Sequence, residues 1–401
     1  MSEIKTADVA VVGSGPAGHV AAIQMAKLGL KCVLIGPAHS GTDGRTTALL
    51  GSSVTYLDQL GLWNQVKAQG QALRVMRLFD DTGRLIRAPM TEFDSSEIGL
   101  EAFGYNIDNN KLVAALHEGI GTLEGLIEDQ QFATSVKLED EQAVINMQDG
   151  SQWHVKLAIA ADGRKSLVKE AAGVEMRKWS YPQAALVLNL HHKSHSHNNS
   201  STEFHTPSGP FTLVPYENAN TSSLVCVVTP EEAEELKALK REALALELET
   251  RAHHLYGKFE ILTEPQIFPL AGMVAKQFHG PRAALIAESA HVFPPIGAQG
   301  LNLSLRDIEE LSSQIEQALE AGQKDVGAED ILDGYDKARR TDIWSRTAGV
   351  HMLNMSLLSS IPVLQGLRTA GLAAAKSFSP LRKLLMKAGL DSPSRFSKVG
   401  E

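Results

Sequence analysis

The chain contains 401 residues, of which 43% are hydrophobic and 21% are charged, so it is long enough to bury the cores of two globular domains. Its formal net charge of −9 argues against a nucleic-acid partner, whose phosphates would repel it. Two cysteines, Cys32 and Cys226, cannot form a disulfide framework or a zinc site. We find neither a signal-peptide pattern nor an apolar run of about 18 residues, and we expect a cytoplasmic protein without a spanning helix.

The start of the chain predicts a strand, a turn, a helix and a second strand. An apolar stretch at Asp8–Val12 leads through a glycine-rich turn into a helical pattern at His19–Leu28. Gly29 supplies a helix stop, and Lys31–Ile35 is a second apolar stretch. This is a βαβ unit that opens an α/β fold.

Two further apolar strands are predicted at Leu157–Ala161 and Ala283–Ala287, each followed closely by an acidic residue. Between them, residues 181–269 alternate apolar and polar side chains and include a charged helical stretch near 231–250. This alternating pattern predicts a mainly antiparallel sheet inserted into the first domain. From about Val326 the pattern is helical.

The segment Gly13-Ser-Gly-Pro-Ala-Gly18 matches the dinucleotide motif G-x-G-x-x-G in its strand–turn–helix context. Gly13 permits the tight turn, Gly15 lets the backbone approach a pyrophosphate, and Gly18 allows close packing of helix on strand. The helix N-terminus would face the phosphates with its positive end. The acidic residue expected after the second strand is replaced by Gly36, so the ribose must be bound in another way or less well.

Three segments lie where open α/β sheets bind ligands, at or beyond the ends of strands. Asp162-Gly163 follows one strand and Glu288 another; a turn and a helix-starting charge are the structural alternatives for these two. Pro294–Asn302 is an apolar, glycine-bearing loop that runs into a helix. Its backbone amides could receive a polarised carbonyl of a flat ring.

Together these segments resemble the flavin aromatic hydroxylases of the para-hydroxybenzoate hydroxylase type, and most of all the ubiquinone-biosynthesis hydroxylases. The resemblance covers residues 7 to about 350. It departs from the family at Gly36, at Glu288 where the family has Asp, at Ala287 where it has Gly, and at Asn110 where the branch often has Arg. The segments that carry it are Gly13–Gly18, Asp43–Leu49, Leu60–Trp63, Tyr105–Leu112, Ala160–Ser166, Gly209–Pro215, Ala287–His291 and Pro294–Asp307.

The resemblance implies FAD as the cofactor and assigns roles to individual residues. The first glycines would hold the pyrophosphate, Arg45 would contact the flavin side, and Glu288 would bind the ribityl hydroxyls. The loop before residue 302 would lie under the isoalloxazine ring. The implied cofactor-binding residues are Gly13, Gly15, Pro16, Ala17, Gly18, Arg45, Asp162, Gly163, Glu288, Pro295, Gly297, Gln299, Gly300, Leu301 and Asn302.

The expected fold class is α/β, with a Rossmann-type FAD-binding domain, an inserted mainly antiparallel β-sheet substrate domain and C-terminal helices. The FAD-binding domain would span residues 1–175, with an excursion to the substrate side near 75–105. The substrate domain would span 176–270. The FAD-binding domain would return at 271–345 with the flavin-ring loop, and 346–401 would form a C-terminal helical region.

The reaction implied by the resemblance is hydroxylation of a polyprenylated phenol in ubiquinone biosynthesis. NAD(P)H would reduce FAD, O₂ would add to it, and a flavin hydroperoxide would deliver oxygen to the ring. The predicted partners are therefore a lipophilic phenol and O₂, with membrane contact and other enzymes of that pathway as further partners. No catalytic side chain is assigned, and His291 is better explained as a structural residue.

Two alternatives stay open at this point. One is another flavoenzyme on this fold, such as a prenyl reductase, a different aromatic hydroxylase or a halogenase, although the four tryptophans do not form a halogenase-like Trp-x-Trp signature. The other is a non-enzymatic prenyl-binding protein, against which the flavin-ring loop argues.

Two other features allow competing interpretations. His191, His192, His195 and His197 lie in a Ser/Asn-rich stretch, which favours a solvated loop over a metal site. Residues 347–367 lack charged side chains, and 368–401 carry seven basic residues against two acidic ones. This pattern suits peripheral attachment at the inner face of a membrane; a helix packed on the body with a solvated basic face is the equal alternative. The basic residues are Arg368, Lys376, Arg382, Lys383, Lys387, Arg395 and Lys398.

Overall fold

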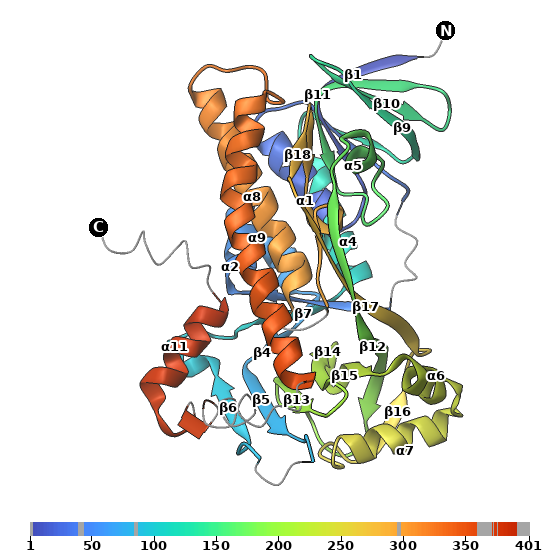
Figure 1. Ribbon diagram of the computed structural model, residues 1–401, viewed down its shortest axis with the longest axis vertical. Coiled ribbons are helices and arrows are strands. Elements are labelled where there is room, and N and C mark those ends of the chain that lie inside the picture. The colour runs from blue at the N-terminus through green and yellow to red at the C-terminus, as the bar shows by residue number, and fades with distance from the viewer. Residues whose placement is uncertain are drawn as a thin grey trace.

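In the computed structural model, the chain is described at residues 3–38, 44–83, 87–294, 298–358, 371, 373–374 and 376–390. Three sheets organise these residues, of eight, nine and three strands. The first sheet and its helices form the upper part of the molecule in Figure 1, and the second sheet forms the lower part. The predicted α/β class with an inserted, mainly antiparallel sheet is confirmed.

The first sheet has the strand order β18-β19-β11-β1-β2-β8, and β19, β11, β1, β2 and β8 run parallel. Residues Val9–Val12 of β1 are almost fully buried beneath helix α1, as a strand covered on both faces requires. A hairpin, β9–β10, pairs with the outer part of β11. The elements are β1 (Ile4–Val12), α1 (Pro16–Lys27), β2 (Cys32–Ile35), β8 (Leu126–Asp129), β9 (Ala133–Leu138), β10 (Ala143–Met147), β11 (Gln152–Ala160), α5 (Leu167–Ala171), β18 (His279–Gly280) and β19 (Ala283–Leu285).

The second sheet is antiparallel except where β13 pairs in parallel with β5, which comes from a distant part of the chain. Helices α6 and α7 pack against it. The expected single helix near 231–250 is wrong: Leu239 and Lys240 adopt extended backbone between these two helices. The elements are β5 (Val75–Asp80), β6 (Thr91–Asp94), β12 (Met176–His192), β13 (Ser200–His205), β14 (Pro210–Tyr216), β15 (Asn218–Val228), α6 (Pro230–Ala238), α7 (Arg241–Arg251), β16 (Phe259–Ile261), β17 (Gln266–Ala275) and β20 (His291–Val292).

The third sheet connects the other two. Its strand β7 lies between β3 and β4, and Asn106 of β7 donates a hydrogen bond to the carbonyl of Pro215 on β14, at 2.9 Å. Asp108 caps helix α4 by accepting from two backbone amides. The elements are β3 (Thr46–Leu50), α2 (Gly51–Gln59), α3 (Trp63–Lys67), β4 (Gly70–Leu73), η1 (Ser95–Ile98), β7 (Gly104–Asp108), α4 (Asn109–Glu118) and η2 (Ile120–Thr122).

Two long helices, α8 (Gln299–Glu320) and α9 (Glu329–Leu358), lie side by side along the first sheet, and α8 also packs on α1 (Figure 1). A further helix, α11 (Ser379–Leu390), contacts η1. The short segment η3 (Ala287–Ser289) lies between β19 and β20. None of the described helices is long and apolar enough to cross a membrane.

Helix α11 packs on the body through one of its faces. Arg382 makes a bidentate ion pair with Glu97, with nitrogen–oxygen distances of 2.6 to 3.0 Å. Met386 and Leu390 are buried in a small cluster with Phe103. Both interpretations of the tail treat its basic residues as facing outwards, to lipid or to solvent. Arg382 instead pairs with the body of the protein.

The histidine-rich stretch differs from the expected solvated loop, because His192 and His197 are fully buried. His197 accepts from the backbone amide of Asn199 at 3.0 Å and donates to the carbonyl of Asn218 at 2.8 Å. His192 stacks on Tyr256 with ring centres 4.5 Å apart. The two rings fill the end of the second sheet's core, so the solvated interpretation is wrong for them.

Burial, together with the neighbouring His197, lowers the pKa of His192 to about 4. An unfolded histidine titrates near pH 6.5, so the unfolded chain binds the extra proton first as the pH falls. We therefore predict that the melting temperature drops as the pH is lowered from about 6.5 towards 4, and that His192→Phe, which keeps a flat ring against Tyr256, flattens this dependence. Thermal melts at several pH values measure it, with His195→Gln as the exposed control; equal slopes in all three proteins would contradict the prediction.

Candidate cofactor site

Two glycines of the predicted motif are required by close packing. A Cβ atom on Gly13 would lie 2.3 Å from the carbonyl oxygen of Ala161, and Gly13 has a φ of +117°. A Cβ atom on Gly18 would lie 1.8 Å from the carbonyl oxygen of Gly13. The turn after β1 thus presses against the end of β11, while α1 presses against the turn.

The middle glycine has a different environment. Gly15 is the N-cap residue of α1, and a Cβ atom there would meet nothing within 4 Å. Pro16 and Ala17 follow in the first turn of the helix, which contains no acidic side chain. The first amides of a helix lack partners within the helix and carry its positive end. Open space in front of these amides suits a pyrophosphate, which supports the predicted role of Gly13–Gly18.

The ends of β11 and β19 bring Asp162 and Glu288 to the same edge of the sheet, since these strands are neighbours. Glu288 accepts from Arg164 at 3.1 Å, with both side chains about half exposed. Asp162 accepts from the amide of Leu167 at 2.8 Å through one oxygen, whereas its other oxygen is buried and has no partner among the described residues. Burial raises the pKa of Asp162.

Gly163 has a φ of +80° and open space around it. It begins a turn in which the amide of Ser166 donates to the Gly163 carbonyl at 3.1 Å. The unpaired oxygen of Asp162 is an acceptor available to a bound hydroxyl or water. The turn interpretation and the ligand interpretation are therefore compatible at this position.

The start of α8 is fixed to the third sheet by Asn302. Its amide nitrogen donates to the carbonyls of Ala48 and Ala298, at 2.7 and 2.6 Å, and its oxygen accepts from the amide of Leu50 and the hydroxyl of Ser53, at 2.9 and 2.6 Å. The side chain of Asn302 has therefore used its hydrogen-bonding capacity within the protein. Its part in cofactor binding would be to position the helix.

The other residues of the predicted flavin-ring loop lie at the first turn of α8. Ala298 has a φ of +52°, Gly300 has open space beside its Cα atom, and Leu301 packs against the main core. Gln299 accepts from Arg346 of α9 at 3.3 Å. Pro295 and Gly297, also predicted to bind the cofactor, lie outside the described residues.

Arg45 lies just before β3 and faces the second sheet. Its guanidinium carbon is 5.5 Å from the centre of the Phe268 ring on β17, and its carbonyl accepts from the amide of Asn109. The exposed arginine therefore lies between the third sheet and the second sheet. Its predicted contact with the flavin stays a prediction.

The sequence interpretation missed the buried carboxylate that organises this end of the site. Asp307 of α8 accepts from the amide of Ala287 at 3.0 Å, from His291 at 2.7 Å and from Arg339 at 2.9 Å. Burial would raise the pKa of Asp307, but the charges of His291 and Arg339 hold it below its usual value. His291 is 2% exposed and bound to Asp307, in agreement with a structural role. The sequence signal that could have indicated this is an acidic residue among the apolar positions Leu305, Ile308 and Leu311 of the predicted helix.

The residues present fit a dinucleotide with a flat ring. They offer the open N-terminus of α1 for phosphates, the unpaired Asp162 oxygen for a hydroxyl, and the first amides of α8 for a ring carbonyl. Fold and site together define an oxidoreductase that uses such a cofactor.

A match to the family described as FAD binding domain covers residues 6–349 of the chain, and the chain belongs to that family. Ubiquinone hydroxylase UbiL of Rhodospirillum rubrum is 29% identical over 391 residues, which cover 96% of this chain and 89% of that protein. The 3-demethoxyubiquinol 3-hydroxylase of Escherichia coli is 26% identical, with 96% and 98% covered.

Among solved structures, p-nitrophenol 4-monooxygenase PnpA from Pseudomonas putida has the same fold, with a TM-score of 0.79, 18% identity and coverage of 98% of this chain and 100% of that one. The predicted resemblance to the ubiquinone-biosynthesis hydroxylases, FAD as the cofactor and the monooxygenase class are confirmed. The domain limits and the individual cofactor-binding residues stay predictions.

Gly15→Val provides a direct test of the phosphate site. A side chain there would fill the open space in front of α1 without a clash inside the protein, so the fold should survive while FAD affinity falls by about 100-fold or more, equivalent to roughly 3 kcal/mol. Flavin absorbance after gel filtration and calorimetric titration of the apoprotein measure the loss. Gly121→Val, at another open glycine, is the matched control; full flavin content in Gly15→Val would place the phosphates elsewhere.

Proposed function

We propose that the protein hydroxylates the aromatic ring of a polyprenylated phenol in ubiquinone biosynthesis. The observation that carries the proposal is similarity along nearly the whole chain to hydroxylases of ubiquinone and its precursors. Two segments near the start of the chain contact the inserted sheet. Arg45 lies against the Phe268 ring, and Asn106, in the segment Tyr105–Leu112, donates to the Pro215 carbonyl. A ring held on that sheet would then keep a fixed relation to the flavin.

FAD, when bound, supplies the electrons and the oxygen activation, with NAD(P)H as the proposed reductant. The task of this chain is to hold the ring system, orient the phenol and exclude water. The first amides of α8 would stabilise negative charge on the ring carbonyl, since they point from a helix N-terminus. We assign no proton-transfer residue, and His291 is already bound to Asp307.

The proposal is tested by supplying purified holoprotein with NAD(P)H, O₂ and a short-chain prenylated phenol, and by identifying the product by mass spectrometry. We expect a gain of one oxygen atom, labelled when ¹⁸O₂ is used. A saturated prenyl chain with no oxygen gain would instead identify a prenyl reductase. Binding of the phenol without NAD(P)H oxidation would identify a prenyl-binding protein.

We further propose that α11 touches the membrane in which such a substrate lies. Its outer side chains Leu384 and Leu385 are 58% and 47% exposed, and Phe378, directly before the helix, is 59% exposed. Arg382 and Met386 face the body. Lys383 and Lys387 are exposed beside the apolar residues. Apolar and basic side chains on one outer face suit shallow insertion among anionic headgroups.

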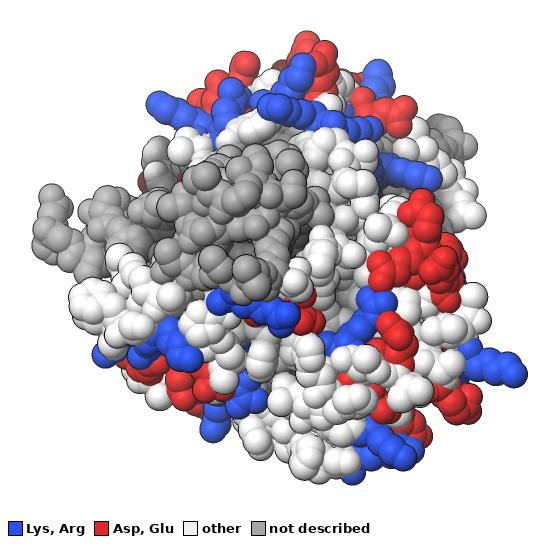
Figure 2. Space-filling model, turned by 60° about the horizontal axis from the view of Figure 1, so that its bottom comes forward, with Lys and Arg blue, Asp and Glu red and all other residues white. Residues whose placement is uncertain are grey.

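The face of the molecule drawn in Figure 2 shows no broad field of one sign among the described residues. On the face drawn in Figure 2, basic and acidic side chains are interspersed with uncharged surface. Attachment would therefore depend on α11 and the residue before it, through the exposed apolar side chains of Phe378, Leu384 and Leu385 and the lysines of the helix.

Replacing Lys383 and Lys387 with Gln should weaken binding to anionic vesicles by roughly thirtyfold, since each lysine near such a surface contributes about 1 kcal/mol. The Arg382–Glu97 ion pair is left intact in this variant. Lys237→Gln with Lys240→Gln, on exposed positions of α6 and the segment after it, is the matched control. Co-sedimentation at low and high salt measures the effect, and equal sedimentation of both variants would show that α11 is only a solvated face.

A further inference from the structure

A cavity of 300 Å³ lies beside the phosphate end of the site. Ser14 of the glycine-rich turn lines it, together with Leu34 and Gly36 at the end of β2 and His117 of α4. It therefore continues from the phosphate position towards the carboxyl end of β2. In dinucleotide-binding folds, this is where the adenosine half of the cofactor extends from the pyrophosphate.

The end of β2 cannot supply the expected carboxylate in this chain. A Cβ atom on Gly36 would lie 2.8 Å from the hydroxyl of Ser14 and 2.9 Å from its amide nitrogen. The same hydroxyl donates to the carbonyl of Pro37 at 2.7 Å, which holds Ser14 in place. A larger residue at position 36 would have to displace this turn.

The next strand brings a carboxylate to the same cavity. Glu128 of β8 pairs in register with Leu34 of β2, and both line the cavity. Side chains alternate between the faces of a sheet, so Gly36, two residues beyond Leu34, lies on the same face as Glu128. Among the described residues that line the cavity, Glu128 is the one carboxylate.

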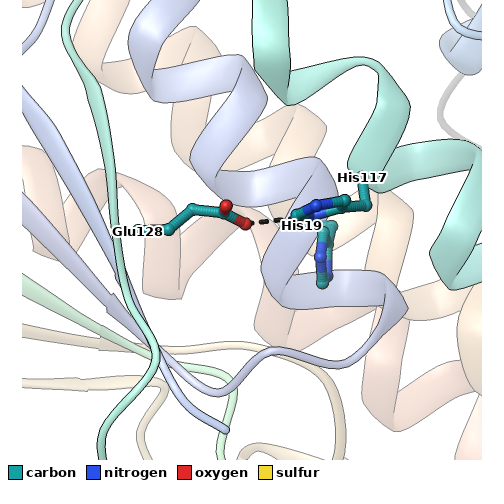
Figure 3. A group of neighbouring side chains, drawn as sticks. All are labelled: His19, His117 and Glu128. Carbon is teal, nitrogen blue, oxygen red and sulfur yellow. Dashed lines mark ion pairs between the residues drawn. The ribbon is translucent and has the colours of Figure 1, made fainter. Parts of the chain in front are cut away.

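Two histidines surround Glu128. His117 lies 3.0 Å from a Glu128 oxygen, and its ring meets that of His19 edge-on with centres 6.1 Å apart. Figure 3 shows the three side chains converging from α4, α1 and β8. His19 donates through Nδ1 to the carbonyl of Gly15 at 3.1 Å, so it also belongs to the start of the phosphate-binding helix.

We propose that Glu128, from β8, binds the adenosine ribose hydroxyls of FAD in place of the carboxylate that is missing at Gly36. A carboxylate accepts two hydroxyl hydrogen bonds well. His117 lies 3.0 Å from one oxygen of the Glu128 carboxylate, and Glu128 lines the cavity. This inference rests on FAD as the cofactor and does not depend on which phenol is hydroxylated.

The alternative occupant is a metal ion, because one ligand atom from each of His19, His117 and Glu128 can lie within 4.8 Å of the others. One observation favours the ribose, because the cluster borders a cavity with space for much more than an ion.

The test measures the binding of FAD to deflavinated protein, with the quenching of flavin fluorescence as the signal. Glu128→Gln should raise the FAD dissociation constant by about tenfold or more, because a neutral amide is a weaker acceptor than a carboxylate. Glu118→Gln, at an exposed position at the end of α4, should leave it unchanged. Melting curves of the apoproteins check that both variants fold.

A second probe, FAD with a 2′-deoxy adenosine ribose, identifies the partner of Glu128. Wild-type protein should bind this analogue about tenfold more weakly than FAD, whereas Glu128→Gln should hardly distinguish the two. Unchanged FAD affinity in Glu128→Gln would overturn the proposal. So would a Glu128→Gln variant that still loses about tenfold in affinity when the 2′-hydroxyl is removed, because the two losses would then be independent. So would Zn²⁺ binding to the apoprotein that Glu128→Gln abolishes without changing FAD affinity. Because these readouts are binding constants, a protein that binds FAD but does not hydroxylate a phenol would contradict only the proposed function.

Discussion

The carboxylate of Asp307 is the buried charge around which the cofactor site is built. It is fully buried, and its three donors come from the turn after β19, from β20 and from α9. Ala287, whose amide is one of these donors, has a φ of +56°, a conformation that a residue with a side chain adopts only when its surroundings hold it there. Removing the Asp307 carboxylate would break its buried ion pair with Arg339, a loss that costs about 3–5 kcal/mol in protein interiors. Asp307 thereby fixes where Glu288 leaves the sheet and how α8 is oriented.

The same network continues towards the flavin-ring loop. Arg339 also pairs with Asp342, and Asp342 pairs with Arg346, which donates to Gln299 at the first turn of α8. Asn302 ties that turn to the third sheet. The start of α8 is thus held from both sides by hydrogen bonds within the protein. Pre-formed positioning of this kind lets backbone amides stabilise charge on a ring without reorganisation.

Much of this architecture could be predicted from sequence because it depends on local patterns. The apolar runs at β1, β2 and β11, and the glycines between β1 and α1, identify a dinucleotide fold since only a close-packed turn demands Gly13 and Gly18. Contacts between distant segments could not be predicted in this way. An excursion to the substrate side near 75–105 is expected from the sequence, but the partner strand and the parallel direction of β5 on β13, like the pairing of Arg382 with Glu97, depend on tertiary packing. The polar stretch around His192 suggested solvent, yet two of its rings became core.

Gly36 shows that the dinucleotide motif describes a requirement of the ligand, an acceptor for the ribose hydroxyls. The motif does not fix which residue supplies that acceptor. The hydroxyl of Ser14 occupies the space that a side chain at Gly36 would enter, so the two positions constrain each other. In a parallel sheet the neighbouring strand presents side chains to the same face, only one strand spacing away. An acceptor lost from β2 can therefore be replaced from β8 without changing the path of the backbone around the phosphates. Because this replacement follows from strand order, which sequence spacing alone does not reveal, departures from a motif are best interpreted after the neighbouring strands are known.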